Sequence, residues 1–120
     1  MSDFRDLQFY RKAFDNAMAI FELTRVFPTE EKYSLTTQIL KSARSVCANI
    51  AEGYRKRQFV KHFSAKLSDA DMENSETIVW LDFSIACGYL SQDAYAAMID
   101  RFQEVGRMLH YAINNPEKFR

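Results

Sequence analysis

The sequence predicts an all-α fold, an antiparallel up-down-up-down four-helix bundle that forms a single domain over residues 1–120. Apolar residues recur along the chain at spacings of three and four, which is the period of an amphipathic helix. The 120 residues include only three glycines and two prolines, too few for a fold with many turns. Long helices joined by short connections pack antiparallel to their neighbours, and no segment alternates with the period of a strand.

The first helix is expected at residues 4–26, because Pro28 disfavours helical geometry at the preceding residue. After it, Thr29 and two glutamates predict a short turn. The apolar face of this helix is expected to be formed by Leu7, Tyr10, Phe14, Met18 and Phe21.

The second helix is expected at residues 35–52, with Ser34 as its N-cap and Gly53 as its C-terminal stop. The side chains that recur at helical spacing and are expected to face the core are Leu35, Ile39, Ala43, Val46 and Ile50.

The third helix is expected at residues 58–87 and should end at Gly88. Its core-facing residues are expected to be Phe59, Phe63, Leu67, Ala70, Asn74, Thr77, Ile78, Leu81 and Ile85. The fourth helix is expected at residues 92–114, with Ser91 as N-cap and Pro116 beyond its end. Its apolar stripe is predicted to comprise Tyr95, Met98, Ile99, Phe102, Val105, Leu109, Ala112 and Ile113.

The composition argues against several classes of protein. No apolar run approaches the roughly 20 residues that span a bilayer, so we expect no membrane association and a cytoplasmic location. Cys47 and Cys87 lie in apolar helical segments and are expected to be buried free thiols, which suits a reducing compartment. His62 and His110 stand alone, outside any metal-ligand spacing. We therefore expect no cofactor, no metal and no enzymatic activity.

Charge is segregated along the chain although the formal net charge is zero. Five lysines or arginines and no acid lie between Arg55 and Lys66, whereas residues 67–100 contain seven acids and no lysine or arginine. Such a basic cluster predicts weak, salt-sensitive binding to nucleic acid phosphates. Tyr54 and Phe59 flank the cluster, and Phe59 is assigned to the core. The candidate nucleic-acid-binding residues are Lys41, Arg44, Arg55, Lys56, Arg57 and Lys61.

The acidic part of the chain suggests a second kind of surface. Asp69, Glu73 and Glu76 fall on one face of the third helix, since spacings of four and three return to the same side. A solvated face explains this stripe simply; alternatively, it meets basic residues of another subunit. Trp80 lies beside the apolar stripe of the same helix, and tryptophan is enriched in subunit interfaces. These four residues are therefore the candidate oligomer interface.

Several stretches taken together resemble one family over most of the chain, namely FRDLQFYRKA, LTRVFPTEEKYSL, ANIAEGYRKR and CGYLS. This combination is similar to the proteins encoded in intervening sequences of bacterial 23S ribosomal RNA genes. The resemblance implies a four-helix bundle, assembly as a homopentameric ring and no established enzymatic activity. A related branch, the accessory proteins of diversity-generating retroelements, binds nucleic acid through a basic surface. Asn49, Glu52 and Gly53 match the family motif, for which a structural role is expected.

Two functional hypotheses follow. The first is a non-enzymatic homo-oligomer, expected to be a pentamer, that binds RNA or a ribonucleoprotein weakly through its basic corner. The alternative is a structural or adaptor protein that binds a protein partner and no nucleic acid, in which case the segregated charges serve subunit pairing.

Overall fold

The computed structural model describes residues 3–120, and this part of the chain contains four α-helices and no strand. The helices are α1 (Gln8–Thr24), α2 (Leu35–Arg55), α3 (Val60–Ala86) and α4 (Gln92–Asn114). Three short 3₁₀ turns accompany them: η1 (Phe4–Asp6), η2 (Thr29–Glu31) and η3 (Pro116–Phe119). The predicted all-α class with four helices is confirmed.

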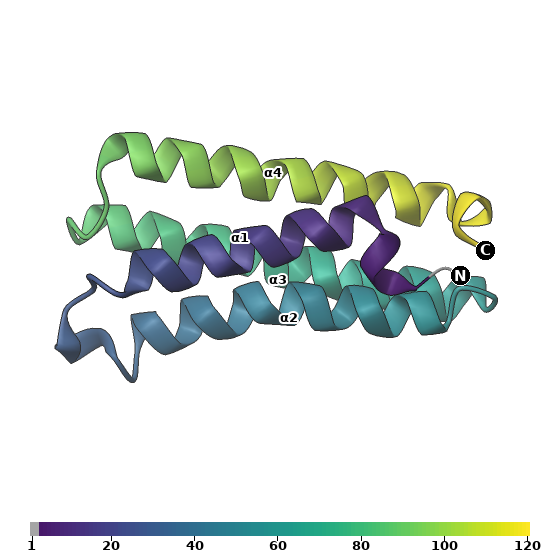
Figure 1. Cartoon of the computed structure of the whole chain (residues 1–120), viewed down its shortest axis with the longest axis horizontal. Coiled ribbons are helices and arrows are strands. Elements are labelled where there is room, and N and C mark those ends of the chain that lie inside the picture. The colour runs from purple at the N-terminus through teal and green to yellow at the C-terminus, as the bar shows by residue number, and fades with distance from the viewer. Residues whose placement is uncertain (1–2) are drawn as a thin grey trace.

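The helices form an elongated bundle that measures 44 × 25 × 24 Å (Figure 1). α1 packs against α2 and α4, and α3 packs against the same two helices, so α1 and α3 lie on opposite corners of the bundle. These contacts fit the predicted up-down-up-down order. Both chain ends and the turn between α2 and α3 lie at one end of the bundle, on the right of Figure 1.

The interior has two apolar clusters separated by a polar layer. One cluster is built around Phe9, Phe63 and Leu109 near the end that carries the termini, and the other around Ile20 and Phe102. Between them, hydrogen bonds join buried polar groups of different helices. The Asn16 Nδ2 donates to the Arg101 carbonyl at 3.0 Å, the Asn74 Nδ2 donates to the Phe102 carbonyl at 2.7 Å, and the Ser42 and Thr77 hydroxyls lie 2.7 Å apart.

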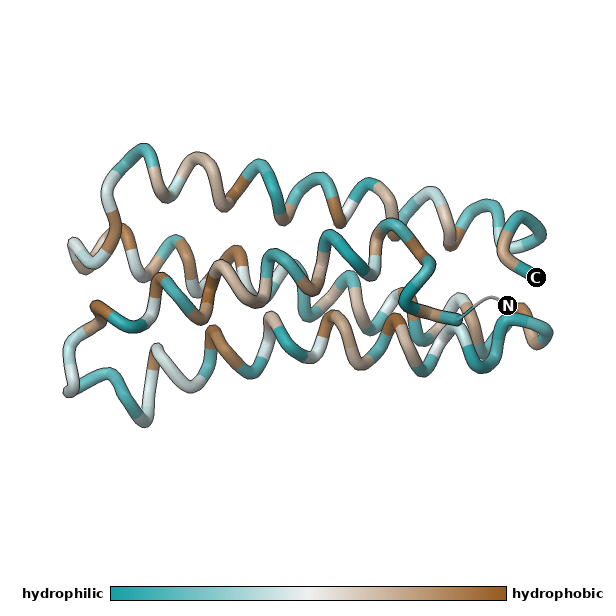
Figure 2. Tube along the Cα trace, viewed as in Figure 1, coloured by the Kyte–Doolittle hydropathy of each residue, from teal (hydrophilic) through white to brown (hydrophobic). Residues whose placement is uncertain are grey.

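The predicted core faces of α2 and α4 are confirmed. All five residues named for α2 are buried, and in α4 the buried residues are Met98, Phe102, Val105, Leu109 and Ala112, with the other three partly buried. Hydropathy along the trace shows apolar residues returning regularly on each helix (Figure 2). A single stripe of large apolar residues leaves only one way to orient each of these helices against the core.

The predicted core face of α1 is wrong. Its buried residues are Phe9, Ala13, Asn16, Ala17, Ile20 and Thr24. Phe14, Met18 and Phe21 are exposed, whereas Leu7 and Tyr10 pack only partly against the core. Both faces of α1 have helical spacing, and the face with small alanines lies against the bundle because it allows closer helix packing. α1 also begins later than predicted, since Leu7 is extended between η1 and α1.

The ends of the other helices differ from expectation in three places. Phe59 precedes α3 and is exposed, so it is not a core residue. Gly53 does not end α2, which continues to Arg55. Ser34 occupies the N-cap position but its hydroxyl caps nothing; instead the Glu31 carboxylate accepts from the Leu35 N–H at 3.3 Å.

Two predicted helix-end signals are confirmed at the turn between α3 and α4. The Ser91 Oγ accepts from the Ala94 N–H at 3.1 Å, as an N-cap does. Gly88 follows the end of α3 with φ +80°, a conformation that favours glycine.

Candidate nucleic-acid interface

The turn between α2 and α3 presents a basic corner, which we define as Arg55, Lys56, Arg57 and Lys61. Arg55 is the last residue of α2, Lys56 is its C-cap and Lys61 is the second residue of α3, so the ends of the two helices place these residues at one turn. Arg55, Lys56 and Lys61 are exposed, and within residues 3–120 none of the three forms an ion pair. Their charges are therefore available to an anionic partner.

Arg57 has a second, structural task. Its guanidinium lies 4.1 Å from the centroid of the Tyr54 ring, and its Nη1 donates to the Tyr54 carbonyl at 3.0 Å. This hydrogen bond satisfies one of the carbonyl groups left unpaired at the end of α2. Arg57 is partly buried as a result, and it offers fewer free donors than its three neighbours.

The two aromatic residues that flank the basic corner differ in environment, and the assignment of Phe59 to the core is wrong. Tyr54 is buried in the bundle. Phe59 is 58% exposed and meets the ring of His62 edge-on, with 6.2 Å between centroids. An exposed aromatic ring next to lysines and arginines is the usual arrangement for stacking on an unpaired base.

Three acidic residues near this end of the bundle form ion pairs with residues outside the basic corner. Glu52 pairs with Lys66 at 2.8 Å, an interaction that joins α2 to α3. Asp3 pairs with Arg5 at 3.0 Å, and Asp6 lies 3.5 Å from Arg11. Because these carboxylates have partners of their own, they do not neutralise the basic corner.

The C-terminal turn η3 adds a cation that the sequence analysis missed. Phe119 packs against Phe9, at 5.7 Å between ring centroids, and against Phe63, at 6.0 Å. These contacts hold η3 against the end of the bundle that carries the basic corner, and Lys118 is exposed there. The signal available in the sequence was Phe119, an apolar residue after the helix-ending Pro116.

Lys41 and Arg44 do not join the basic corner. At about 1.5 Å per residue, Arg44 lies about 16 Å from Arg55 along α2, and Lys41 about 21 Å. Both are exposed and border a shallow hollow on the outer side of α2. Lys41 also acts on the acidic stripe of its own chain: burial raises the pKa of Glu73, nearby Glu76 adds to this effect, and the charge of Lys41 opposes it.

The motif residues Asn49, Glu52 and Gly53 serve the packing of α2. The Asn49 amide donates to the Ser45 carbonyl at 2.9 Å within the same helix. Gly53 lies against α3, where an added Cβ would stand 3.2 Å from the Lys66 Cβ and 3.3 Å from the Leu67 Cδ2. Glycine at this position permits the close approach of α2 and α3, and the Glu52–Lys66 ion pair lies beside it.

The acidic stripe lies on α3, away from the basic corner. Asp69 and Glu76 are exposed, and Glu73 and Trp80 are partly buried. The Trp80 Nε1 donates to the Glu76 Oε1 at 3.3 Å, and its ring packs on Phe83 with 5.9 Å between centroids. Trp80 therefore belongs to a surface that combines acidic and aromatic side chains.

The thiols differ from each other. Cys47 is partly buried, and this burial raises its pKa to about 11. Cys87 is exposed, which contradicts the expectation that both thiols are buried, because α3 ends before it. Within residues 3–120, no three His, Cys, Asp or Glu side chains come together as metal ligands.

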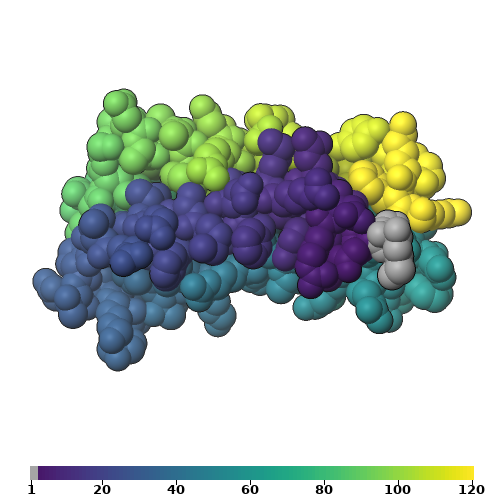
Figure 3. All heavy atoms as spheres, in the orientation of Figure 1, coloured from purple at the N-terminus to yellow at the C-terminus, as the bar shows by residue number. Residues whose placement is uncertain are grey.

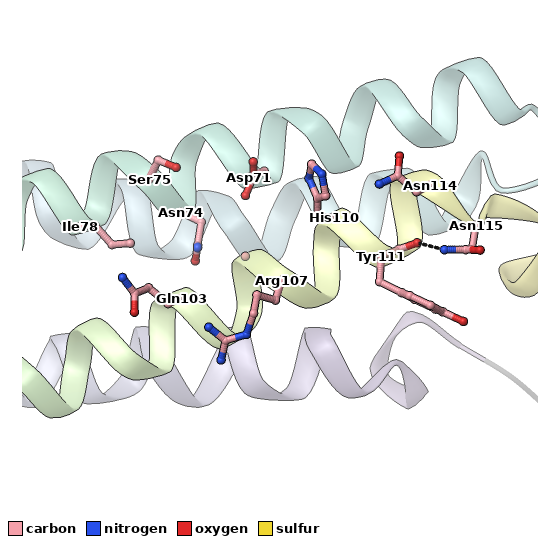
Figure 4. Close-up of a pocket in the computed structure, with 11 residues that line it drawn as sticks. Asp71, Asn74, Ser75, Ile78, Gln103, Arg107, His110, Tyr111, Asn114 and Asn115 are labelled. Carbon is pink, nitrogen blue, oxygen red and sulfur yellow. Dashed lines mark hydrogen bonds between the residues drawn. The ribbon is translucent and has the colours of Figure 1, made fainter.

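A groove of about 790 Å³ runs between α3 and α4 and was not predicted (Figure 4). Polar side chains from both helices line it, among them Asp71, Asn74, Arg107 and His110. Gly106 lies at its floor, where an added Cβ would be 3.4 Å from the Asn74 Nδ2. The groove is open to solvent and separate from the basic corner.

No helix in the described residues is both long and apolar enough to cross a membrane.

Comparisons with known proteins agree with this fold. A search of curated proteins gives no match. The crystal structure of a protein with unknown function from the S23 ribosomal protein family of Bacteroides thetaiotaomicron is 29% identical, with a TM-score of 0.80 over 88% of this chain and 95% of that one. A family model described as 23S rRNA-intervening sequence protein matches residues 5–111, and the chain therefore belongs to that family.

Proposed function

We propose that this protein is a non-enzymatic homo-oligomer that binds RNA, alone or within a ribonucleoprotein, through the basic corner. The observation that carries the proposal is the group of exposed cations at Arg55, Lys56 and Lys61, none of which has an ion-pair partner within residues 3–120. Neutralising RNA phosphates with such side chains releases condensed counterions, and this release drives binding.

Three further observations support RNA as the partner. Phe59 places an exposed ring among the cations, where it stacks on an unpaired base and holds it next to the charged side chains. Lys118, held at the same end by Phe119, extends the charged surface. The family takes its description from sequences that interrupt 23S rRNA, which favours RNA over DNA as the first ligand to test.

Oligomerisation strengthens an interaction that is weak for one chain. The net charge of the chain is zero, so a single basic corner binds RNA with low affinity. A ring of parallel bundles, with five copies as the resemblance implies, brings every basic corner to one side. A long RNA then contacts several corners at once, and the avidity exceeds the affinity of each.

The test is charge reversal at the basic corner. Lys56→Glu with Lys61→Glu leaves Arg57 and its hydrogen bond to α2 intact. We expect this variant to bind a fluorescently labelled single-stranded RNA at least about tenfold more weakly at low salt. We also expect the slope of log K against log salt to flatten by about 1.4, since each lost phosphate contact contributes about 0.7. Fluorescence anisotropy across a salt series measures both quantities.

The matched control is Lys41→Glu with Arg44→Glu, which changes the net charge equally on the outer side of α2. This control should retain most of the binding if the basic corner is the site. Equal losses in both variants would show that net charge alone matters. Wild-type protein that binds no RNA even at low salt would contradict the proposal and favour an adaptor that pairs only with protein.

A further inference from the structure

Two helices on opposite corners of the bundle carry large apolar side chains that are exposed in the structure of residues 3–120. On α1, Phe14, Met18 and Phe21 are 48%, 47% and 37% exposed, and we name them the α1 stripe. On α3, Met72, Val79 and Phe83 are 66%, 45% and 54% exposed, and we name them the α3 stripe. α1 forms the near face of the bundle between α4 and α2 in Figure 3. Large exposed apolar residues that share one face of a helix are typical of interaction surfaces.

We propose that the α1 stripe of one copy packs against the α3 stripe of the next copy, in a repeated head-to-tail contact that closes into a ring. This inference rests on the self-association in the proposed function and assigns the surfaces that perform it. A contact between two different surfaces of the same chain closes into a ring only when three conditions hold. The surfaces must match in height, in direction and in chemistry.

The heights match because the polar layer fixes the register of the helices. Asn16 of α1 and Asn74 of α3 donate to the carbonyls of adjacent α4 residues, so these two asparagines lie at one level. Phe14 and Met72 each lie two residues before their asparagine, and Phe21 and Val79 each lie five residues after it. α1 and α3 both start at the end that carries the termini (Figure 1). Neighbouring copies therefore pair their stripes without a shift along the bundle axis, and a ring forms instead of a helical filament.

The directions of the stripes also fit closure. At about 100° per residue, the α1 stripe is centred about 110° from the core-facing line of α1 and turned toward α2. The side is fixed by Lys12 and Asn16, whose contacts with Glu104 and Arg101 mark the side of α4. The α3 stripe is centred about 170° from the core-facing line of α3. In a square bundle the two surfaces then face directions about 100° apart, between the angles of about 90° and about 108° that rings of four and five copies require.

The charges beside the two stripes are complementary. Arg11 lies before the α1 stripe and Arg25 follows it, both exposed; each also lies near an exposed carboxylate of its own chain, Asp6 at 3.5 Å and Glu22 at 3.8 Å. Asp69 and Glu76 are exposed on α3, and Asp69 lies five residues before Asn74, as Arg11 lies five before Asn16. Parallel packing of the stripes consequently brings Arg11 of one copy to the level of Asp69 on the next. Opposite charges around an apolar contact fix its register and favour the correct partner.

Each stripe borders a hollow that can accept a side chain from the other. Tyr10 and Phe14 line a hollow of about 270 Å³ on α1, together with Arg5 and Arg11. Trp80 and Phe83 line one of about 440 Å³ beside α3. Trp80 and the acidic stripe, which the sequence analysis predicted as an oligomer interface, lie beside these exposed apolar residues. In the proposed ring they border the contact with the next copy.

The test uses two variants that each lose one surface. The α1 variant carries Phe14→Glu and Phe21→Glu, and the α3 variant carries Met72→Glu and Val79→Glu. All four residues are exposed, so both variants should fold, which circular dichroism checks. Native mass spectrometry should show a ring for the wild type and a monomer for each variant. An equimolar mixture of the variants should form a one-to-one dimer and nothing larger, because only one intact α1 stripe and one intact α3 stripe can meet.

The outcomes separate this inference from its alternatives. A control with Val26→Glu and Tyr111→Glu, exposed residues outside both stripes, should keep the ring. A monomeric wild type, a variant that keeps the ring, or a mixture that stays monomeric would overturn the pairing of α1 with α3. The RNA anisotropy assay on the wild type tests the RNA-binding part of the proposed function separately, since it depends on the basic corner and not on the stripes. Rings that bind no RNA would refute only the RNA binding, whereas monomeric wild type that binds RNA would refute self-association and this interface and leave the RNA binding standing.

Discussion

Gly53 and Gly106 lie inside helices, where glycine costs about 1 kcal/mol relative to alanine. The space available for a Cβ atom differs between the two positions. A Cβ at Gly53 would meet the Lys66 Cβ and the buried Leu67 side chain at 3.2 and 3.3 Å, closer than ordinary packing allows. A Cβ at Gly106 would stand 3.4 Å from the Asn74 Nδ2 and 3.7 Å from the Asp71 Oδ1, in a groove open to solvent. Glycine therefore favours the close packing of α2 on α3 at the first position and is dispensable for packing at the second.

The two alanine substitutions should change stability in opposite directions. Gly106→Ala should raise the free energy of unfolding by about 1 kcal/mol through helix propensity. Gly53→Ala should lower it by about 1 kcal/mol, because the strain of forcing α2 away from α3 exceeds the gain in propensity. Urea unfolding followed by circular dichroism measures both. Two changes of the same sign would show that close α2–α3 packing does not explain the glycine of the motif.

Hydrogen bonds between elements fix the end of the bundle opposite the termini. The Tyr89 hydroxyl, after α3, donates to the Glu31 carboxylate of η2 at 2.8 Å. This bond raises the pKa of Tyr89 to about 12. The pKa of Glu31 is lowered by its hydrogen bonds to Ser34, then to Tyr89 and to the Leu35 N–H. A carboxyl whose pKa is lowered in the folded state stabilises the protein above its ordinary pKa, and this contribution disappears as the pH falls through the folded value.

Tyr89→Phe should consequently destabilise the protein at pH 7 and have less effect at a pH below the folded pKa of Glu31, where the carboxyl is protonated. It should also move the pKa of Glu31 up toward its ordinary value. Urea unfolding at the two pH values and an NMR titration of Glu31 measure these effects. Tyr33→Phe, at an exposed residue whose hydroxyl forms no hydrogen bond within residues 3–120, should change neither quantity. An equal loss at both pH values would show that the bond to Glu31 is not the cause.

At the level of elements, the sequence correctly predicted which face lies against the core for helices that have one apolar stripe. α2 and α4 each present a single set of large apolar residues at helical spacing, so their orientation follows from the pattern. α1 has two such sets, and spacing cannot decide between Phe9, Ala13 and Ile20 on one side and Phe14 and Met18 on the other. The choice depends on how closely α1 approaches its neighbours, which is a property of the assembled bundle.

The part of the candidate site that is local in sequence could be predicted, and the part that depends on the packing of the whole bundle could not. Arg55, Lys56 and Lys61 are close in sequence, and the helix ends keep them together. Lys118 lies near them only because Phe119 packs against Phe9 and Phe63 at the end of the bundle that carries the termini. The opposite environments of Tyr54 and Phe59 depend on where α2 ends, and that position differed from prediction by three residues.

At the scale of the whole molecule, the apolar stripes and the basic corner occupy different parts of the bundle. The stripes run along its sides on α1 and α3, whereas the basic corner lies at the end that carries the termini. A ring built through the sides therefore leaves every basic corner exposed on one face. In the proposed assembly, this separation would let self-association and RNA binding act together, since joining the copies would concentrate the cations without covering them.

Native mass spectrometry of the full chain, purified at low salt without nuclease treatment, tests this account most directly. We expect a closed ring of identical copies that carries RNA and releases it as the salt concentration rises, while the ring itself persists. Salt should remove the RNA if the basic corner binds phosphates through counterion release, and should leave the ring if apolar burial holds the stripes together. A monomer free of nucleic acid under these conditions would contradict both the assembly and the function proposed here.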